Sequence, residues 1–418
     1  MRAAIVGGGI GGLAAGLALA HRGIEFDIFE QATEPDAAGA SLSIGPNAVR
    51  LLDEIGVGVG EELRRVGSVP DTVDLLRWDD GSLLHRSTLG PEMEKRFGAP
   101  QLDLFRPDLQ RVMIEALPEG SLHLGAKVTA VREEDGRAFV ALEDGSEVDA
   151  DLAVAADGIR SPVRRQLFGP EDPVFSGTVV YRGVVPREEV ADLHPPRENM
   201  YWLGPQRHGV SYWLSGGERL AVTLATREAD WSRESWTLEA PAAEAIEFVD
   251  GWDEGFRARL ALCGTMLRGA VFVREPIERW SVGRVTLLGD AAHAMAPFQA
   301  QGSAQAIEDA YVLAACLADE GTNAIAAIGR YESIRLSHAA ELQGSAQSAA
   351  DTFYLLDGEE QRARDVAYAT LHERQPWGPR EGLWDYDVRT ELGAPAPSRP
   401  ALGPGAASNG TMGAGRPI

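Results

Sequence analysis

A glycine-rich turn between two apolar segments dominates the start of the chain. Ala3–Val6 predicts a short strand, Leu13–Arg22 a helix and Phe26–Phe29 a second strand. The turn after the first strand spaces three glycines as G-x-G-x-x-G: Gly7, Gly9 and Gly12. A strand, such a turn, a helix and a second strand in this order constrain the chain to an α/β fold with a parallel, Rossmann-like sheet.

The turn is suited to a dinucleotide. Glycines let the chain turn sharply and let a pyrophosphate approach the backbone, while the helix N-terminus offers free N–H groups and about half a positive charge. Glu30 follows the second strand, where its carboxylate can accept both ribose hydroxyls of an adenosine. The same carboxylate would repel a 2′-phosphate, so FAD or NAD is predicted at this site and NADP is not. An ordinary glycine-rich turn is the alternative.

The composition excludes several classes of protein. The 418 residues include 63 acidic and 39 basic side chains, a net charge of −24, which disfavours binding to nucleic acid or to an anionic membrane. The two cysteines, Cys263 and Cys316, predict neither a disulfide framework nor a metal site. Residues 3–20 are uncharged, as in a signal peptide, but their six glycines disfavour export. We therefore expect a cytoplasmic protein.

The middle of the chain has a different sequence pattern. Residues 173–279 contain short strand-like segments separated by Gly-Pro and Gly-Gly turns, which predict an antiparallel sheet. On either side, Glu147–Ala156 and Arg284–Leu288 predict buried strands, and Ser303–Leu317 predicts a long helix. The expected organisation is a discontinuous dinucleotide-binding domain with C-terminal helices (1–72, 100–172 and 280–393), an inserted substrate-binding β-sheet domain (73–99 and 173–279) and a disordered tail rich in Pro, Gly and Ala (394–418).

A second motif follows the first of these buried strands. Asp157-Gly158 is followed by Ser161 and Pro162, which are suited to the N-cap and first position of a helix. Taken alone, the segment is therefore a structural turn.

A third motif follows the second buried strand. Gly289-Asp290 leads to Gly302-Ser303, where the long helix begins. Asp290 can accept hydrogen bonds from the ribityl hydroxyls of a flavin. The N–H groups of Gly302 and Ser303 can face the pyrimidine edge of the isoalloxazine, which is negative when reduced.

With these three motifs in order, the chain resembles the single-component FAD-dependent aromatic-ring monooxygenases, or flavoprotein hydroxylases, and among them the salicylate, 3-hydroxybenzoate and 6-hydroxynicotinate hydroxylases. The resemblance covers about residues 1–390. Phe105-Arg106-Pro107-Asp108-Leu109 is similar to the family's Arg-x-Asp-Leu segment, whose arginine contacts FAD. The resemblance implies cofactor contacts at Gly7, Gly9, Gly12, Glu30, Gln31, Ala40, Ser41, Arg106, Val128, Asp157, Asp290, Pro297, Gly302 and Ser303.

Two segments depart from the family pattern. Ala300-Gln301-Gly302 stands where the family has Gly-Gln-Gly, and Gly39-Ala40-Ser41-Leu42 stands where it has Gly-Ala-Gly-Ile. Both segments are expected to border the flavin, so the mobility or the solvent access of the flavin is expected to differ.

The resemblance implies a reaction in which NADPH or NADH reduces FAD, O2 adds to give a C4a-hydroperoxyflavin, and an aromatic or heteroaromatic small molecule is hydroxylated. Gly204-Pro205-Gln206-Arg207-His208, with Tyr212 four residues on, is similar to a hairpin of the salicylate-type members. It implies His208 as the catalytic base and Tyr212 as a substrate contact. A histidine exposed on a surface hairpin is the alternative.

Other side chains have structural interpretations. His293 is expected to be a packed histidine bonded to nearby backbone, and Arg182 to form an ion pair. The aromatic residues Tyr201, Trp202 and Trp213 either line an apolar pocket or fill the core of the sheet.

Rival functions are another FAD oxidoreductase of the same fold, such as a reductase or an oxidase, and a non-enzymatic flavin-binding protein. The sequence leaves open which aromatic substrate is used, the choice between NADH and NADPH, and whether the protein is a monomer or a homodimer.

Overall fold

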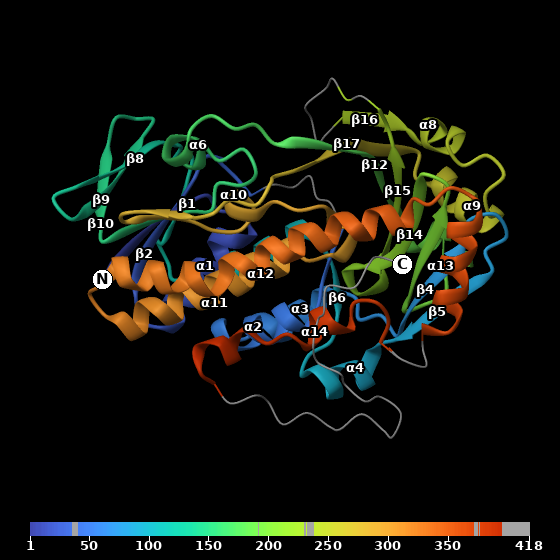
Figure 1. The fold of residues 1–418 in the computed structure, drawn as a ribbon, viewed down its shortest axis with the longest axis horizontal. Coiled ribbons are helices and arrows are strands. Elements are labelled where there is room, and N and C mark those ends of the chain that lie inside the picture. The colour runs from blue at the N-terminus through green and yellow to red at the C-terminus, as the bar shows by residue number, and fades with distance from the viewer. Residues whose placement is uncertain are drawn as a thin grey trace.

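The computed structural model describes residues 1–35, 41–190, 192–229, 231, 238–371, 375 and 377–394. Ala40 and the predicted tail from residue 395 onward lie outside the described residues. Figure 1 shows two lobes side by side, with the long helix α12 (Ala324–Phe353) running from one to the other. Among the described residues, no helix combines the length and the hydropathy of a membrane span.

A six-stranded sheet forms the centre of the first lobe. Its strands lie in the order β18 (Ser281–Val282), β19 (Val285–Leu287), β11 (Leu152–Ala155), β1 (Arg2–Val6), β2 (Glu25–Glu30) and β7 (Leu122–Leu124). All neighbours pair in parallel except β18 and β19. Every residue of β11 is buried, as expected for a strand covered on both faces. The parallel, Rossmann-like sheet predicted from the sequence is confirmed.

Helices cover this sheet and continue towards the second lobe. The glycines and alanines of α1 let it pack closely against α11, and both belong to the main hydrophobic core. The helices of this part of the chain are α1 (Ile10–His21), α2 (Pro46–Ile55), α3 (Val59–Val66), α5 (Arg106–Glu115), α6 (Pro162–Phe168), α10 (Asp290–His293) and α11 (Gly302–Glu320). The C-terminal segment adds α13 (Glu359–Ala369), α14 (Glu381–Asp385) and the 3-10 helix η4 (Val388–Leu392).

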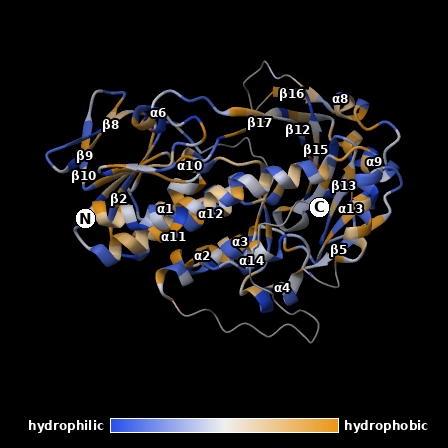
Figure 2. Ribbon diagram, viewed as in Figure 1, coloured by the Kyte–Doolittle hydropathy of each residue, from blue (hydrophilic) through white to orange (hydrophobic). Residues whose placement is uncertain are grey.

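The strand predicted over Glu147–Ala156 is in fact two strands. β10 (Glu147–Ala150) pairs with β9 (Arg137–Leu142) and β8 (Val128–Glu134) in a separate antiparallel sheet, whereas β11 belongs to the parallel core. Asp151 separates them, and its carboxylate accepts from the backbone N–H of Arg2 at 2.7 Å. Figure 2 shows the β8–β10 hairpins as largely hydrophilic, in agreement with the mostly exposed side chains of β8.

An eight-stranded sheet forms the second lobe. Its order is β16 (Leu238–Pro241), β17 (Thr265–Val273), β12 (Val174–Pro186), β15 (Arg219–Arg227), β14 (Arg207–Leu214), β13 (Glu198–Gly204), β4 (Thr72–Arg77) and β5 (Leu83–Thr88). The sheet is mixed rather than antiparallel throughout, because β4 and β13 pair in parallel. β4 comes from a part of the chain that precedes the other central strands by about a hundred residues, so no hairpin turn sets its direction.

Short elements complete the two lobes. A two-stranded sheet of β3 (Ser41–Ile44) and β6 (Leu102–Phe105) lies between them. The remaining elements are α4 (Gly90–Phe97), α7 (Arg187–Val190), α8 (Ala242–Glu247), α9 (Glu254–Leu262) and the 3-10 helices η1 (Ser215–Gly217) and η2 (Pro297–Gln299).

Strand alternation assigns the aromatic residues of the second lobe to opposite faces of its sheet. Trp202 and Trp213 belong to the core cluster formed with α8 and α9, so they fill the core of the sheet. Tyr201 and Tyr212 cluster on the other face, which is turned towards the first lobe. His208 lies on this face as well, four residues before Tyr212 on β14.

Candidate active site

The glycine turn leaves open space at the N-terminus of α1, and we call this space the groove. Gly7 has φ +101°, and a Cβ there would lie 2.5 Å from the carbonyl oxygen of Ala156. A Cβ on Gly12 would lie 1.9 Å from the carbonyl oxygen of Gly7. At Gly9, by contrast, a Cβ would meet nothing within 4 Å. The first and third glycines therefore allow close backbone packing, while the second faces space that a pyrophosphate can use.

Glu30 lies beside the glycine turn, where the adenosine ribose is expected. Its carboxylate accepts from the backbone N–H of Gly8 at 2.6 Å and from that of Ala32 at 2.8 Å. A carboxylate has about four acceptor positions, so hydroxyls of a ribose can still bind. The neighbouring Gln31 is exposed to solvent.

The second motif contacts the third through Arg164, and Asp157 lies at its start. Its Oδ2 accepts from the backbone N–H of Val163 at 3.2 Å, whereas its Oδ1 is buried without a hydrogen-bond partner. Burial raises the pKa of this carboxyl. Ser161 caps α6 as predicted, accepting from the N–H of Arg164 at 2.8 Å. The Arg164 guanidinium in turn donates to the carbonyl oxygen of Ala292 at 2.8 Å, inside the third motif.

Asp290 and the N-terminus of α11 lie together. A Cβ on Gly302 would be 3.9 Å from Oδ1 of Asp290. Asp290 is exposed to solvent on one side and surrounded by protein on the others. The surrounding protein desolvates the carboxyl and raises its pKa, whereas the nearby His293 and Arg106 act to lower it. Ser303 is half-buried in the first turn of α11, and Pro297 is exposed at the start of η2. An accessible acid in a crowded groove beside a helix N-terminus fits the ribityl and pyrimidine parts of FAD.

The segments that depart from the family pattern have distinct conformations. Ala300 adopts a left-handed backbone with φ +55°, a conformation that glycine adopts without strain. Ser41 begins β3, and its hydroxyl accepts from the hydroxyl of Tyr212 at 2.8 Å. The Tyr212 side chain therefore holds β3 against β14. Val128, the other predicted contact, is half-buried at the start of β8.

A buried charge network, missed at the sequence level, supports the third motif. His293 is packed, as predicted, but its partner is a side chain and not the backbone: Nε2 lies 2.6 Å from Oδ2 of Asp309. Asp309 also accepts from Arg335 Nε at 2.8 Å and from the N–H of Gly289 at 3.0 Å. Burial alone would raise the pKa of Asp309, but His293 and Arg335 hold it at about 2. Arg335 also donates to Glu308 at 2.9 Å.

The network continues to the N-termini of α11 and α2. Asn47, in the first turn of α2, donates to Glu308 at 2.7 Å and to the side-chain oxygen of Gln301 at 3.1 Å. Gln301 immediately precedes Gly302, so these contacts fix the helix end that is expected to face the flavin.

His208 is buried, with 8% of its surface exposed, so its interpretation as a surface hairpin residue is wrong. Its ring lies 5.5 Å from those of Phe298 and Tyr354 and 5.6 Å from that of Phe353. Burial lowers its pKa to about 4, so the imidazole is neutral at pH 7. Nδ1 is buried and has no hydrogen-bond partner.

An aromatic pocket of about 170 Å³ adjoins His208. Phe298 and Phe353, which contact His208, also line this pocket. Its other lining residues include Tyr201 from β13 and Trp377, Arg380 and Trp384 from the C-terminal segment. The C-terminal segment was predicted to belong to the dinucleotide-binding domain, with no contact to the substrate, although an arginine between two tryptophans was a visible signal. We call this cavity the reaction pocket.

Comparison with known proteins decides the family. A model of the FAD binding domain family matches residues 1–345. The chain belongs to this family. A 3-amino-4-hydroxybenzoate 2-monooxygenase of Streptomyces platensis is 36% identical over 369 residues, covering 88% of this chain and 92% of that protein. A 6-hydroxynicotinate 3-monooxygenase of Pseudomonas fluorescens is 33% identical, covering 82% and 89%.

Solved structures agree. HpxO of Klebsiella pneumoniae, in complex with FAD and uric acid, superposes with a TM-score of 0.80 at 27% identity and covers 94% of this chain and 97% of its own. A substrate complex of salicylate hydroxylase superposes with a TM-score of 0.79 at 27% identity and covers 96% and 99%. The chain is a FAD-dependent monooxygenase that hydroxylates an aromatic compound with O2 and NAD(P)H, as the sequence predicted. The reductase, oxidase and non-enzymatic interpretations are thereby set aside.

Proposed function

We propose that this monooxygenase hydroxylates a small aromatic carboxylic acid in the reaction pocket and that Arg380 binds the carboxylate. The pocket volume of about 170 Å³ suits a single substituted ring. The relatives named above act on an aminohydroxybenzoate and a hydroxynicotinate, which are both single-ring acids. The residues proposed to hold FAD are Gly7, Gly9, Gly12, Glu30, Arg106, Asp157, Asp290, Gly302 and Ser303.

Arg380 is the observation that carries the substrate class. No carboxylate lies within 4 Å of it among the ion pairs of the described residues. Its guanidinium stacks at 5.3 Å from the ring of Trp384 and hydrogen-bonds to Tyr201. Among the described residues no carboxylate forms an ion pair with this half-buried guanidinium, although Asp103 lies close enough to interact with it electrostatically. An anion that enters the pocket therefore stabilises the guanidinium further, and carboxylate and guanidinium can pair through two parallel hydrogen bonds.

His208 is proposed to accept a hydrogen bond or a proton from a ring hydroxyl of the substrate. A neutral imidazole with a free Nδ1 is an acceptor, and an anionic substrate nearby would raise its low pKa. Bound FAD supplies the oxygen chemistry. The protein orients the ring, excludes water with the aromatic residues around Phe298, and accepts the proton. A substrate contact by Tyr212 stays a prediction, since its hydroxyl is engaged by Ser41.

Substrate pairs that differ only in the carboxylate test this function. Hydroxy- and aminobenzoates and hydroxynicotinates should stimulate NAD(P)H oxidation and give products heavier by one oxygen, whereas the matching carboxamides should not. Arg380→Met should raise KM for the acids about 10- to 150-fold, which corresponds to one charge-assisted hydrogen-bonded contact of about 1.5–3 kcal/mol. Arg380→Lys should recover part of the loss.

Arg279→Met is the matched control, since Arg279 also lies over an aromatic ring, Phe168, at 5.6 Å, but on another part of the surface. Equal turnover of acids and amides, or an unchanged KM in Arg380→Met, would contradict the assignment. A cytoplasmic location and a monomeric or homodimeric state remain predictions.

A further inference from the structure

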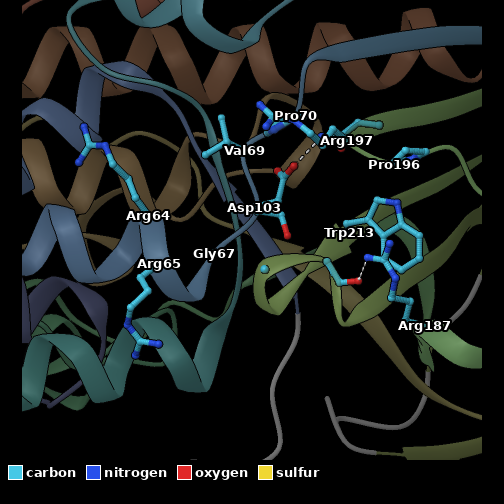
Figure 3. A pocket seen from close by; sticks show the side chains of 14 residues that line it. Arg64, Arg65, Gly67, Val69, Pro70, Asp103, Arg187, Pro196, Arg197 and Trp213 are labelled. Carbon is cyan, nitrogen blue, oxygen red and sulfur yellow. Dashed lines mark hydrogen bonds between the residues drawn. The ribbon is translucent and has the colours of Figure 1, made fainter. Parts of the chain in front are cut away.

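A second cavity, of about 300 Å³, lies between the two lobes and is separate from the groove and from the reaction pocket. One wall comes from α3, the loop that follows it and Asp103 of β6. The other wall comes from Arg187 of α7, the chain before β13, Trp213 of β14 and the η1 turn (Figure 3). We call it the interlobe cavity.

Arginines dominate its charge. Four arginines line the cavity, Arg64, Arg65, Arg187 and Arg197, against one carboxylate, that of Asp103. Arg64, Arg65 and Arg197 pair with carboxylates that are not part of the wall: Asp53, Glu62 and Asp71. Figure 3 shows the guanidinium groups of Arg64 and Arg65 on the far side of the cavity from Arg187.

Arg187 is different from the other three. Within the described part of the chain it has no ion pair with a carboxylate. Its guanidinium lies 5.3 Å from the ring of Trp213 and donates one hydrogen bond, of 2.9 Å, to the carbonyl oxygen of Gly217. A guanidinium has five N–H donors, so Arg187 keeps donors for an anion. The indole beneath it orients the guanidinium plane.

The opposite side of the cavity offers groups for a second polar substituent. The hydroxyl of Ser68 is buried and has no hydrogen-bond partner. The carboxylate of Asp103 accepts from Asn199 at 2.7 Å and from Gln101 at 3.2 Å. Ser43 also donates to this carboxylate, which is fully buried, so Asp103 is already satisfied within the wall. A ring that carries a carboxylate and a hydroxyl or amino group can therefore place the first at Arg187 and the second at Ser68.

The interlobe cavity adjoins the reaction pocket along one strand. Asn199 lines the interlobe cavity and Tyr201 lines the reaction pocket. They are two residues apart on β13, so they share a face and are separated by about 7 Å. Arg187 and Arg197 are exposed to solvent, which makes the interlobe cavity the outer of the two.

We propose that the interlobe cavity is a second, outer binding site for single-ring aromatic carboxylic acids. The inference rests on the proposed function, because it takes the substrate class from the reaction pocket. The net charge of −24 repels an anionic substrate at long range. The arginines of the interlobe cavity offset this repulsion locally. The outer site holds the acid beside the reaction pocket, from which it can move inward.

Calorimetric titration of the FAD-loaded protein with 3-hydroxybenzoate, without NAD(P)H, counts the sites. The wild type should bind two equivalents. Arg187→Ala should lose the outer site alone, Arg380→Ala should lose the inner site alone, and Arg279→Ala should keep both. In turnover, Arg187→Glu should lower kcat/KM about tenfold with kcat unchanged, and this difference should shrink as the salt concentration rises.

A single site in the wild type that Arg380→Ala abolishes would overturn the outer site and leave the proposed function standing. Two sites that both survive Arg380→Ala would instead contradict the proposed function. Unchanged binding and kcat/KM in the Arg187 variants would overturn the role of Arg187.

Discussion

Gly9 offers a substitution that separates cofactor binding from folding. It is the N-cap of α1 with φ −73°, a conformation open to any residue, and a Cβ there would meet no atom within 4 Å. Gly9→Ala should therefore leave the free energy of unfolding of the apoprotein within about 0.5 kcal/mol of the wild type.

The same methyl group would project into the groove where the pyrophosphate approaches the N-terminus of α1. Holding the phosphates away from the backbone N–H groups removes at least one hydrogen bond to a charged group, worth about 1.5–3 kcal/mol. The dissociation constant for FAD should therefore rise about 10- to 150-fold.

Fluorescence titration of the apoprotein with FAD measures this change. Gly329→Ala is the control, since Gly329 lies within α12 and its Cβ would also meet nothing within 4 Å; its affinity for FAD should not change. Gly12→Ala should instead destabilise the protein itself, because its Cβ would lie 1.9 Å from the carbonyl oxygen of Gly7. An unchanged FAD affinity in Gly9→Ala would refute the placement of the pyrophosphate.

Three further substitutions test the surroundings of the site by urea denaturation. Arg335→Met should lower the free energy of unfolding by about 3–5 kcal/mol, because it leaves the buried carboxylates of Glu308 and Asp309 without their cation. Burial lowers the pKa of His208 to about 4, so below pH 6.5 the unfolded chain binds a proton that the folded chain does not. The stability of the wild type relative to His208→Gln should therefore fall by about 3 kcal/mol as the pH drops from about 6.5 to 4, and a constant difference would contradict a buried neutral imidazole. Ala300→Gly should raise the free energy of unfolding by up to about 1 kcal/mol by relieving the left-handed backbone, and a decrease would show that the conformation is not strained.

Short-range sequence patterns correctly predicted the structural elements whose formation depends on neighbouring residues. The glycine turn, the N-cap at Ser161 and the helix predicted over Ser303–Leu317 depend on neighbouring residues, and all three are present in the structure. The division of Glu147–Ala156 was missed because the alternating segment Glu147–Ala150 and the apolar segment Leu152–Ala155 each suit a strand and only Asp151 lies between them.

The errors at the site involve contacts between residues far apart in sequence. The parallel pairing of β4 with β13 joins segments that share no turn, so no local signal sets its direction. The partner of His293 lies on α11, and Arg380 of the reaction pocket comes from a C-terminal segment far from β13 in the sequence. Such contacts form only in the packed fold, so they cannot be predicted from composition or from the spacing of residues in the sequence.

The central claim is that an aromatic acid held at Arg380 receives one oxygen atom from O2 beside the flavin groove. Turnover of a hydroxybenzoate with NAD(P)H under isotopically labelled dioxygen, followed by mass spectrometry of the product, tests it most directly. The product should contain one labelled oxygen on the ring, and Arg380→Met should form it only at much higher substrate concentration. NAD(P)H oxidation that releases hydrogen peroxide and leaves every acid in the panel unlabelled would contradict the account.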